Sequence, residues 1–327
     1  MKAIVRDRYG STDVLHLKDV PKPIPDDTEL LVKVMAASVA KGDLEILRGS
    51  PLWVRLSGFG QFQPKHRIIG YNFSGRVEAV GRSVKNFKCG DEVFGDVLQN
   101  GLGAFAEFMC IPEDAAVIHK PESMTHDEAA SVPEAGCIAL QTLKQAGGIQ
   151  PGESVLINGG GGGAGTYFIQ LAKSLGAAVT GIDRTEKLEL MTSLGADKTV
   201  DYTNVRLEEI DDSYDLILDI VGVGPLRTWR HLLRDGGRYF ASGGTVSHIA
   251  KTLLFGLWCS RTTSKTFGML AVTPSKDNLQ STVELMKNGK VRATIERSYP
   301  LADTAAAIEC LGQGLSQGKL VITVPAR

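Results

Sequence analysis

Two patterns alternate along the second half of the chain. Short, mostly apolar runs with strand character are separated by segments with helical character. The apolar runs cover residues 154–158, 177–182, 214–221, 238–241 and 266–272. Strands that alternate with helices need crossover connections, and such connections bury a parallel sheet between two helical layers. The pattern therefore predicts a doubly wound α/β domain.

The first 120 residues follow a different pattern, in which β-branched runs are broken by glycine and proline. Leu30–Val34, for example, follows the turn-rich segment 21–27. We expect an all-β unit here. Helices begin after Pro121, because Thr125 and Glu128 form a capping box that satisfies free backbone N–H groups. The end of the chain, residues 318–324, again predicts a strand, which we expect to return to the first domain.

Length and charge limit the classes of function. A chain of 327 residues with 43% apolar content is long enough for two domains. Its 36 basic residues nearly balance its 37 acidic residues, so the surface as a whole has no net field that would attract nucleic acid or an anionic membrane. We therefore expect a small-molecule partner and no nucleic-acid partner.

The distribution of apolar residues and cysteines indicates a cytosolic protein. The N-terminal residues become charged too early for the apolar stretch of a signal peptide. The longest apolar segment, Leu253–Cys259, is far shorter than the roughly 20 residues that span a bilayer. Five cysteines are spread without a Cys-x-x-Cys pair, so neither a disulfide framework nor a zinc knuckle is indicated.

A glycine run follows the apolar strand 154–158 and opens a helix whose predicted inward residues are Ile169, Ala172 and Leu175. Within residues 158–165, Gly160, Gly162 and Gly165 fit the spacing G-x-G-x-x-G, and Gly163 and Ala164 begin the helix. Bare backbone and a helix N-terminus together favour a pyrophosphate. A flexible linker is the alternative, but linkers are not held between a buried strand and an amphipathic helix. The run predicts dinucleotide binding.

The residues after the next strand give conflicting indications of the cofactor. Asp183 stands about 20 residues beyond the motif, where an acidic residue hydrogen-bonds the adenosine ribose of NAD. Arg184 and Lys187 follow at once, and a guanidinium beside the ribose commonly holds the 2′-phosphate of NADP. The alternative for both cations is the solvated first turn of a helix.

Several short motifs occur along almost the whole chain in a fixed order. They are residues 36–39 (AASV), 75–81 (GRVEAVG), 89–95 (CGDEVFG), 103–108 (GAFAEF), the glycine run, 194–197 (LGAD) and 318–319 (GK). With them the chain resembles the medium-chain dehydrogenase/reductase superfamily and, within it, the zinc-independent quinone oxidoreductase-like branch. Such a series is highly specific for the fold and weakly specific for the substrate.

The resemblance implies a two-domain fold. A GroES-like, β-rich catalytic domain would comprise residues 1–123 and 290–327. A Rossmann domain with a doubly wound parallel sheet, residues 124–289, would be inserted between these two pieces. Relatives of this kind are often homodimers, so we expect a homodimer. Family habit and Arg184 favour NADP as the cofactor, whereas Asp183 favours NAD.

The zinc enzymes of this superfamily polarise the substrate oxygen with a metal held by Cys, His and a third ligand. By the flanking motifs, the resemblance places Ala40, Tyr71 and Glu134 at these positions. A methyl group cannot bind a metal and a neutral phenol is a poor ligand, so we expect no catalytic zinc. An unrelated metal site on Asp43, Glu45 and Glu134 is the alternative.

Without a Lewis acid, the substrate must already accept hydride readily, as quinones and α,β-unsaturated carbonyls do. Tyr71 is our candidate for the hydrogen-bond donor to the acceptor oxygen, because it replaces a metal ligand that faces the substrate and its phenol is protonated at neutral pH. The alternative is a tyrosine that only fills the space of the metal, with water as the proton source.

The resemblance also assigns residues around the cofactor and the substrate. Those expected near the nicotinamide are Ser242, Gly243, Gly244, Phe267, Gly268 and Met269, with Tyr202 near the adenosine and Lys319 near the cofactor cleft. Each could instead belong to an ordinary turn or to the core. Segment 50–69 should form a long loop over the cleft, and its Trp53 would line the substrate pocket with Ala40, Tyr71 and Glu134.

Three alternatives stay open. Residues 253–258 form a second apolar patch that would face the substrate pocket, a partner subunit or the core. Within enzymes, the chain could be an alcohol or aldehyde reductase that polarises its substrate with protein hydrogen bonds alone. Outside them, it could be a nucleotide-binding protein with little catalysis.

Overall fold

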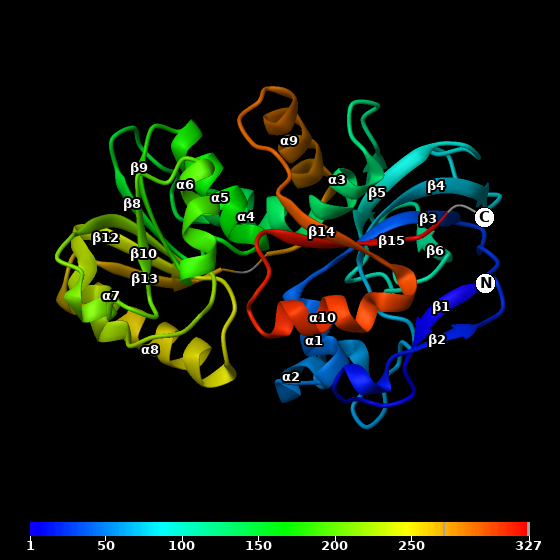
Figure 1. Ribbon diagram of the computed structural model, residues 1–327, viewed down its shortest axis with the longest axis horizontal. Helices are drawn as coiled ribbons and strands as arrows, with labels where there is room; N and C mark the ends of the chain where they lie inside the picture. The colour runs from blue at the N-terminus through cyan, green and yellow to red at the C-terminus, as the bar shows by residue number, and fades with distance from the viewer. Residues whose placement is uncertain (271, 326–327) are drawn as a thin grey trace. The chain divides into compact units, whose positions relative to one another are not determined.

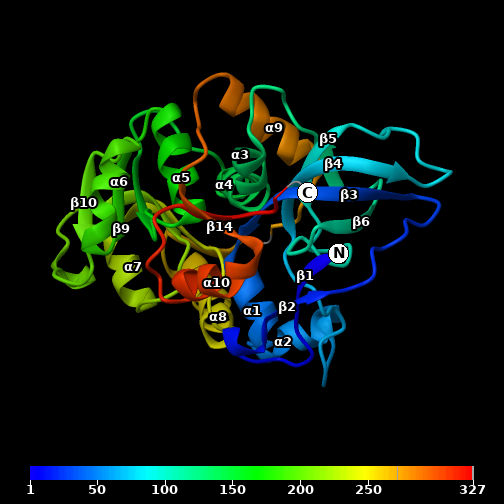
Figure 2. The same ribbon diagram turned by 45° about the vertical axis from the view of Figure 1, so that its right-hand side comes forward.

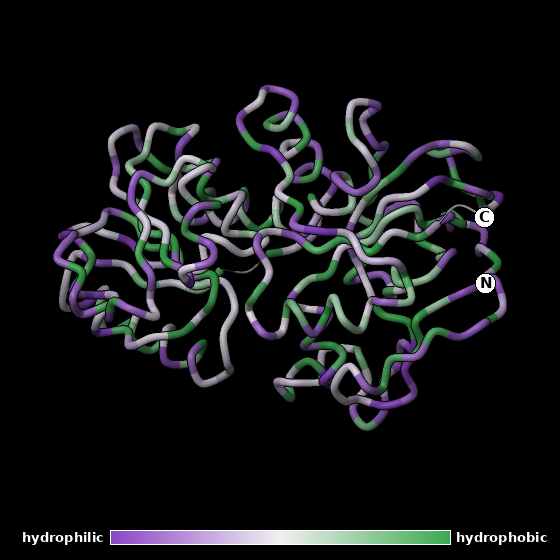
Figure 3. Tube along the Cα trace, in the orientation of Figure 1, coloured by the Kyte–Doolittle hydropathy of each residue, from purple (hydrophilic) through white to green (hydrophobic). Residues whose placement is uncertain are grey.

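The computed structural model describes residues 1–270 and 272–325, and its backbone divides into two compact units (Figure 1). Unit 1 comprises residues 1–137, 274–284 and 293–327, and unit 2 comprises residues 138–273 and 285–292. The domain boundaries expected after residues 123 and 289 stay a prediction. Hydrophilic residues mark many of the outer turns of the chain (Figure 3). Among the described residues, no helix combines the length and the apolar character needed to cross a bilayer.

Unit 2 contains the predicted doubly wound sheet. Its six strands follow the order β10-β9-β8-β11-β12-β13, and every neighbouring pair is parallel. The strands are β8 (Ser154–Asn158), β9 (Ala178–Asp183), β10 (Lys198–Asp201), β11 (Tyr214–Asp219), β12 (Leu233–Ala241) and β13 (Thr266–Met269). Counted from β8, this is the order 3-2-1-4-5-6 of dinucleotide-binding sheets, so the predicted fold class is confirmed.

Helices cover both faces of this sheet (Figures 1 and 2). The helices α5 (Gly163–Ser174) and α6 (Leu188–Ser193) lie on one side, and α7 (Leu226–Leu232) and α8 (Val246–Thr262) lie on the other. Ile169 and Ala172 of α5 are buried as predicted. The prediction for Leu175 is wrong: it is 40% exposed, because α5 ends at Ser174 and Leu175 is its C-cap.

Unit 1 contains a seven-stranded sheet and a two-stranded one. The larger sheet has the order β14-β15-β3-β4-β5-β7, with β6 also paired to β3, and the smaller sheet pairs β1 with β2. The strands are β1 (Lys2–Val5), β2 (His16–Asp19), β3 (Glu29–Val39), β4 (Asn72–Val80), β5 (Glu92–Asp96), β6 (Phe108–Pro112), β7 (Ala116–His119), β14 (Ile295–Pro300) and β15 (Lys319–Thr323). The C-terminal strand β15 pairs antiparallel with β3, so the end of the chain returns to its beginning as predicted.

Residues 1–120 are not all β, contrary to the expectation. Lys41–Arg48 form helix α1, which begins where the Asp43 carboxylate accepts from the Ala40 N–H and ends at Gly49 with φ 59°. Segment 50–69 is also partly helical, with α2 (Leu52–Val54) and a π-helical turn over Arg55–Phe59, rather than one long loop. These elements are too short to show a helical period against the β-branched background.

The remaining helices of the chain are α3 (His126–Ser131), α4 (Pro133–Gln145), α9 (Lys276–Lys287) and α10 (Thr304–Gly312), with short 3-10 turns between elements. The capping box at α3 is confirmed. The Thr125 hydroxyl accepts from the Glu128 N–H, and the Glu128 carboxylate accepts from the Thr125 N–H.

Candidate functional site

The cofactor residues predicted in unit 2 lie along one edge of its parallel sheet. In register across the sheet, the strands end at Asp201, Asp183, Asn158, Asp219 and Ala241, and Met269 pairs with Ala241. The predicted residues stand at or shortly after these ends: Gly160, Gly162, Gly163, Ala164, Gly165, Asp183, Arg184, Lys187, Tyr202, Ser242, Gly243, Gly244, Phe267, Gly268 and Met269. Open α/β sheets bind ligands at this carboxyl edge.

The glycine run forms a tight turn between β8 and α5. Gly159 has φ 88°, a left-handed conformation that favours glycine. A Cβ on Gly165 would lie 2.1 Å from the Gly159 carbonyl oxygen, so the turn closes only with glycine there. A Cβ on Gly162, the N-cap of α5, would meet nothing closer than 3.5 Å. The loop thus presents open backbone at a helix N-terminus, which fits a pyrophosphate.

The Asp183 side chain fixes the glycine loop by accepting a hydrogen bond from its backbone, a role that the sequence did not predict. Its Oδ2 accepts from the Gly161 N–H at 2.9 Å, and its Oδ1 accepts from the Arg184 N–H at 3.0 Å. The Lys187 ammonium lies 3.5 Å from Oδ1. A Cβ on Gly161 would lie 2.6 Å from Lys187 Cβ, so Gly161 leaves room for the Lys187 side chain. Both carboxylate oxygens have protein partners, and a ribose hydroxyl would be a further one.

The two cations after Asp183 differ in exposure. The Lys187 side chain is only 7% exposed, so its alternative as part of a solvated helical turn is wrong. The Arg184 side chain is 33% exposed and lies 3.6 Å from Glu186. Tyr202 follows β10 with 51% of its surface exposed, and its N–H donates to the Asp183 carbonyl. Arg184 and Tyr202 therefore offer accessible side chains beside the end of β9.

A buried carboxylate at the end of β11 accepts hydrogen bonds from β8, from β12 and from the turn that follows β11. Asp219 Oδ1 accepts from the Asn158 side chain at 2.8 Å and from the Gly222 N–H at 2.9 Å. Asp219 Oδ2 accepts from the Tyr239 hydroxyl at 2.7 Å. The available sequence signal was an acid that directly follows the apolar run Leu216–Leu218. Asp219 thus fixes the turns that follow β8 and β11.

Two of the residues expected near the nicotinamide act in packing. The Phe267 ring is buried and stacks on the Tyr239 ring with centroids 4.9 Å apart. A Cβ on Gly268 would lie 2.6 Å from the Phe240 ring, so this glycine leaves room for a neighbouring side chain. The Ser242 N–H donates to the Asp219 carbonyl, which holds the turn after β12 against β11.

Unit 1 brings Tyr71, Glu134 and Lys319 together in one hydrogen-bonded cluster. The Tyr71 hydroxyl donates to Glu134 Oε1 at 2.8 Å, and Lys319 Nζ lies 3.3 Å from Glu134 Oε2. Tyr71 directly precedes β4, Lys319 begins β15, and Glu134 lies in the first turn of α4, where the helix dipole favours a carboxylate. The Tyr71 and Lys319 side chains are buried, while that of Glu134 is 21% exposed.

Two buried aspartates surround this cluster. Burial raises the pKa of Asp43 well above its usual range, with the negative Glu134 adding to the effect. Burial likewise raises the pKa of Asp96 to about 7. Burial and then the charge of Glu134 raise the pKa of Tyr71 well above 10, so its phenol keeps its proton at neutral pH. The cluster therefore holds a neutral donor beside a carboxylate that is paired with an ammonium.

The residues at this place do not fit a zinc ion. Ala40 is buried at the N-cap of α1 and its side chain has no ligand atom, and a Cβ on Gly42 would lie 2.5 Å from the Tyr71 hydroxyl, so the phenol packs directly against α1. Over residues 1–270 and 272–325, no three His, Cys, Asp or Glu side chains are placed to hold one metal ion, which contradicts the alternative site on Asp43, Glu45 and Glu134.

Trp53, the remaining residue predicted for the substrate pocket, lies in α2 with 45% of its surface exposed. Its aromatic neighbour Phe62 is 85% exposed. Segment 50–69 thus presents apolar side chains to solvent.

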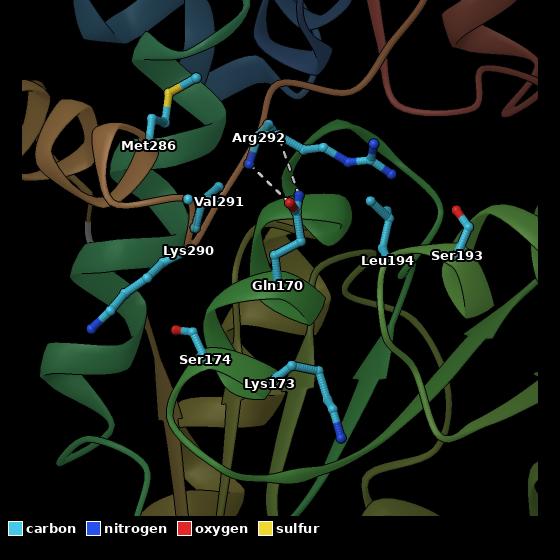
Figure 4. Close-up of a pocket in the computed structure, with 10 residues that line it drawn as sticks. Gln170, Lys173, Ser174, Ser193, Leu194, Met286, Lys290, Val291 and Arg292 are labelled. Atoms are coloured by element: carbon cyan, nitrogen blue, oxygen red, sulfur yellow. Dashed lines mark hydrogen bonds between the residues drawn. The ribbon is translucent and has the colours of Figure 1, made fainter.

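A different pocket of unit 2 contains none of the predicted cofactor residues (Figure 4). The Gln170 carboxamide forms two hydrogen bonds with the Arg292 backbone there. Its Nε2 donates to the Arg292 carbonyl at 3.1 Å, and its Oε1 accepts from the Arg292 N–H at 2.9 Å (Figure 4). These two bonds hold segment 285–292 against α5.

Two family models match the chain. The alcohol dehydrogenase GroES-like domain matches residues 26–122, and the zinc-binding dehydrogenase family matches residues 194–322.

Curated proteins and solved structures match over nearly the full length. The chain is 33% identical to 2-methylene-furan-3-one reductase of Solanum lycopersicum, over 98% of this chain and 79% of that protein. It is 30% identical to the chloroplastic NADPH-dependent alkenal/one oxidoreductase of Arabidopsis thaliana, again over 98% and 79%. The solved quinone oxidoreductase of Coxiella burnetii is 30% identical, covers 99% of both chains and superposes with a TM-score of 0.87.

Proposed function

Since the chain belongs to the medium-chain dehydrogenase/reductase superfamily, in its quinone oxidoreductase-like branch, we propose that it reduces quinones and enones with NADPH and without zinc. Its class is that of an NAD(P)H-dependent oxidoreductase acting on quinones, enones or similarly activated carbonyls. Beyond this class, we propose that the protein prefers NADPH, that it works without zinc, and that the individual residues have the roles described below.

The preference for NADPH rests on the charges after β9. The Asp183 carboxylate already accepts from the Gly161 N–H and lies 3.5 Å from the Lys187 ammonium, which offsets its charge. Repulsion of a 2′-phosphate is thereby reduced, and the accessible Arg184 guanidinium supplies a geometry suited to that phosphate. The glycine loop and the N-terminus of α5 would hold the pyrophosphate, with Tyr202 beside the adenosine.

The catalytic part of the proposal rests on the cluster of Tyr71, Glu134 and Lys319. When bound, a reduced nicotinamide supplies a hydride to an electron-poor carbon of the acceptor. The acceptor oxygen then carries developing negative charge, and the Tyr71 hydroxyl, which has a single proton, would release Glu134 and donate to that oxygen instead. Before the acceptor binds, the 2.8 Å hydrogen bond to Glu134 orients the phenol, and the contact of 3.3 Å between Lys319 Nζ and Glu134 Oε2 holds the Glu134 side chain in place. Trp53 and Ala40 would add apolar surface to the pocket.

The single observation that supports a zinc-free mechanism is the neutral, buried Tyr71 phenol, which packs against Gly42 at a position where the resemblance expects a zinc ligand. We would treat the protein with a chelator and follow NADPH and NADH oxidation with a quinone, an enone and a simple aldehyde. Turnover of the quinone and the enone should survive, and NADPH should give the higher kcat/KM. Tyr71→Phe should lower kcat by about tenfold or more, because one donor to the developing charge is lost.

A matched control is Tyr214→Phe, which removes another buried phenol, in unit 2, and should leave kcat unchanged. Unchanged turnover in Tyr71→Phe would leave Tyr71 as a space-filling residue. Turnover that disappears with chelator and returns with zinc would refute the zinc-free mechanism. Preference for the simple aldehyde would support the alcohol or aldehyde reductase, and tight NADPH binding without any turnover would support the nucleotide-binding protein.

Two further expectations belong to this proposal. A homodimer is compatible with β13, which lies at an edge of its sheet and leaves backbone groups for a second copy to pair with. Location in the cytosol stays a prediction, because a chloroplast protein is among the relatives.

A further inference from the structure

Helix α8 carries four of its large apolar side chains on the outside, whereas Phe255 faces inward and packs edge-on against the Phe267 ring. Its fully buried residues on β13 are small, namely Thr252, Gly256 and Cys259, and a Cβ on Gly256 would lie 2.4 Å from the Phe267 carbonyl oxygen. Its exposed residues include Leu253, Leu254, Leu257 and Trp258, which are 50%, 69%, 55% and 47% exposed. A helix that only covers a sheet directs its large apolar residues inward. The outer face of α8 therefore has the composition of a contact surface.

Positive charge accompanies this apolar face. Between Ile220 and Lys265 the only acidic residue is Asp235, against seven basic residues: Arg227, Arg230, Arg234, Arg238, Lys251, Arg261 and Lys265. Within the described part of the chain, Arg227, Arg230, Lys251 and Arg261 form no ion pair. The balanced net charge of the chain thus conceals a local basic region.

A groove beside α8 combines both properties. It lies between the 222–227 loop and the first turns of α8 and has a volume of about 890 Å³. Its lining includes the cationic Arg227 and Lys251 and the apolar Val223, Leu226 and Leu254. No acidic residue lines it. A phosphodiester with an attached hydrocarbon portion matches this lining in charge and polarity.

The charge pattern selects among possible occupants. If a second copy docked on this face by twofold symmetry, Lys251 and Arg261 of one copy would lie near Lys251 and Arg261 of the other. Repulsion between these like charges opposes such a contact. A nucleic acid would satisfy the cations but would leave three exposed leucines without apolar partners. An anionic lipid surface offers partners to the cations and to the apolar residues alike, since leucine and tryptophan enter the interfacial layer while Lys and Arg contact the headgroups.

We propose that the outer face of α8, with the adjoining groove, docks the protein on the surface of an anionic phospholipid bilayer. In this arrangement Leu254, Leu257 and Trp258 enter the interfacial layer, and Lys251 and Arg261 lie against the phosphates. The helix lies in the plane of the surface and does not span it. This proposal does not rest on the redox function proposed above, although the groove opens beside Gly243 and Gly244, which that function places near the nicotinamide.

Co-sedimentation with vesicles tests the proposal. The purified protein should sediment with vesicles of phosphatidylglycerol and phosphatidylcholine at low salt, much less with pure phosphatidylcholine, and dissociate as salt screens the headgroups. The double variant Lys251→Gln/Arg261→Gln should lower the partition coefficient by about 30-fold, since each cation near an anionic surface contributes about 1 kcal/mol. Leu254→Gln/Leu257→Gln should lower it as well, because buried apolar area is lost.

The matched control is Lys144→Gln/Lys287→Gln, which removes the same charge from exposed positions of unit 2 outside α7 and α8 and should bind as the wild type. Tryptophan emission should shift to the blue with anionic vesicles, and Trp258→Phe should remove most of that shift. Circular dichroism checks that each variant is folded.

Three results would overturn the proposal. The first is no sedimentation with anionic vesicles, and the second is an equal loss of binding in the control. The third is binding that duplex DNA displaces and that Leu254→Gln/Leu257→Gln leaves unchanged. A dimer in light scattering that only the α8 variants dissociate, without an effect on vesicles, would assign the face to a second copy and count against the lipid surface.

Discussion

Replacing Asp96 with asparagine should remove a pH dependence of stability that this buried carboxyl imposes on the protein. Asp96 is 4% exposed, its Oδ1 accepts from the Leu98 N–H, and burial raises its pKa from 3.8 to about 7. The folded state therefore binds this proton more tightly than the unfolded state. The resulting stabilisation is complete below pH 3.8, decreases as the pH rises, and is absent above about pH 7.

The magnitude follows from the size of the shift. One pKa unit corresponds to about 1.4 kcal/mol, so the full shift corresponds to about 4 kcal/mol of unfolding free energy. Between pH 5 and pH 7 the wild type should lose about 2.3 kcal/mol from this group alone, because about 0.4 kcal/mol remains at pH 7. Asparagine has the same shape and no charge, so Asp96→Asn should resemble the protonated wild type at pH 5 and should be the more stable protein at pH 8.

Urea unfolding of both proteins at pH 5, 6, 7 and 8 measures this difference, and an unchanged m-value shows that the same surface is exposed in each. Asp114→Asn alters an exposed carboxyl of unit 1 and should leave the pH dependence of the wild type intact. If the wild type and Asp96→Asn lose stability in parallel across this range, Asp96 does not titrate between pH 5 and pH 8 and the argument from its burial fails.

Three substitutions test other parts of the structure. Gly165→Ala places a Cβ 2.1 Å from the Gly159 carbonyl oxygen and should abolish NADPH binding in calorimetry, with normal binding as the contrary result. Tyr239→Phe removes a buried hydrogen bond to Asp219 and should lower the free energy of unfolding by about 1–3 kcal/mol, and an unchanged urea midpoint would show that water replaces the phenol. Thr125→Ala removes the N-cap of α3 and should cost about 1 kcal/mol in the same assay, whereas Thr125→Ser should cost little.

The sequence was informative wherever a short stretch of chain determines its own conformation. Strand β8 and the glycine turn after it follow from apolar content and from backbone positions that exclude a Cβ, as at Gly165. The capping box of α3 is local in the same sense, because Thr125 and Glu128 are three residues apart. The short helix α1 was missed, since a few helical residues within a β-rich region give too weak a period.

The candidate site depended on contacts that no local pattern contains. Glu134 lies 63 positions after Tyr71 and 185 before Lys319, yet it contacts both. The resemblance had placed Tyr71 and Glu134 at former metal positions, but it did not join them to each other or to Lys319. Asp219 was also missed, because its three partners come from strands and turns that only the sheet brings together.

The sequence by itself therefore determined the alternation of strands and helices in unit 2 and the glycine turn that fits a pyrophosphate. Backbone sterics and apolar periodicity act over a few residues, so a local stretch of sequence is enough to show them. The tertiary structure alone decided the partners and the protonation of the buried polar groups. The pairing of β15 with β3 and of β3 with β4 brings Lys319 toward Tyr71. The exclusion of water from the assembled unit then keeps a proton on Tyr71 and raises the pKa of Asp96.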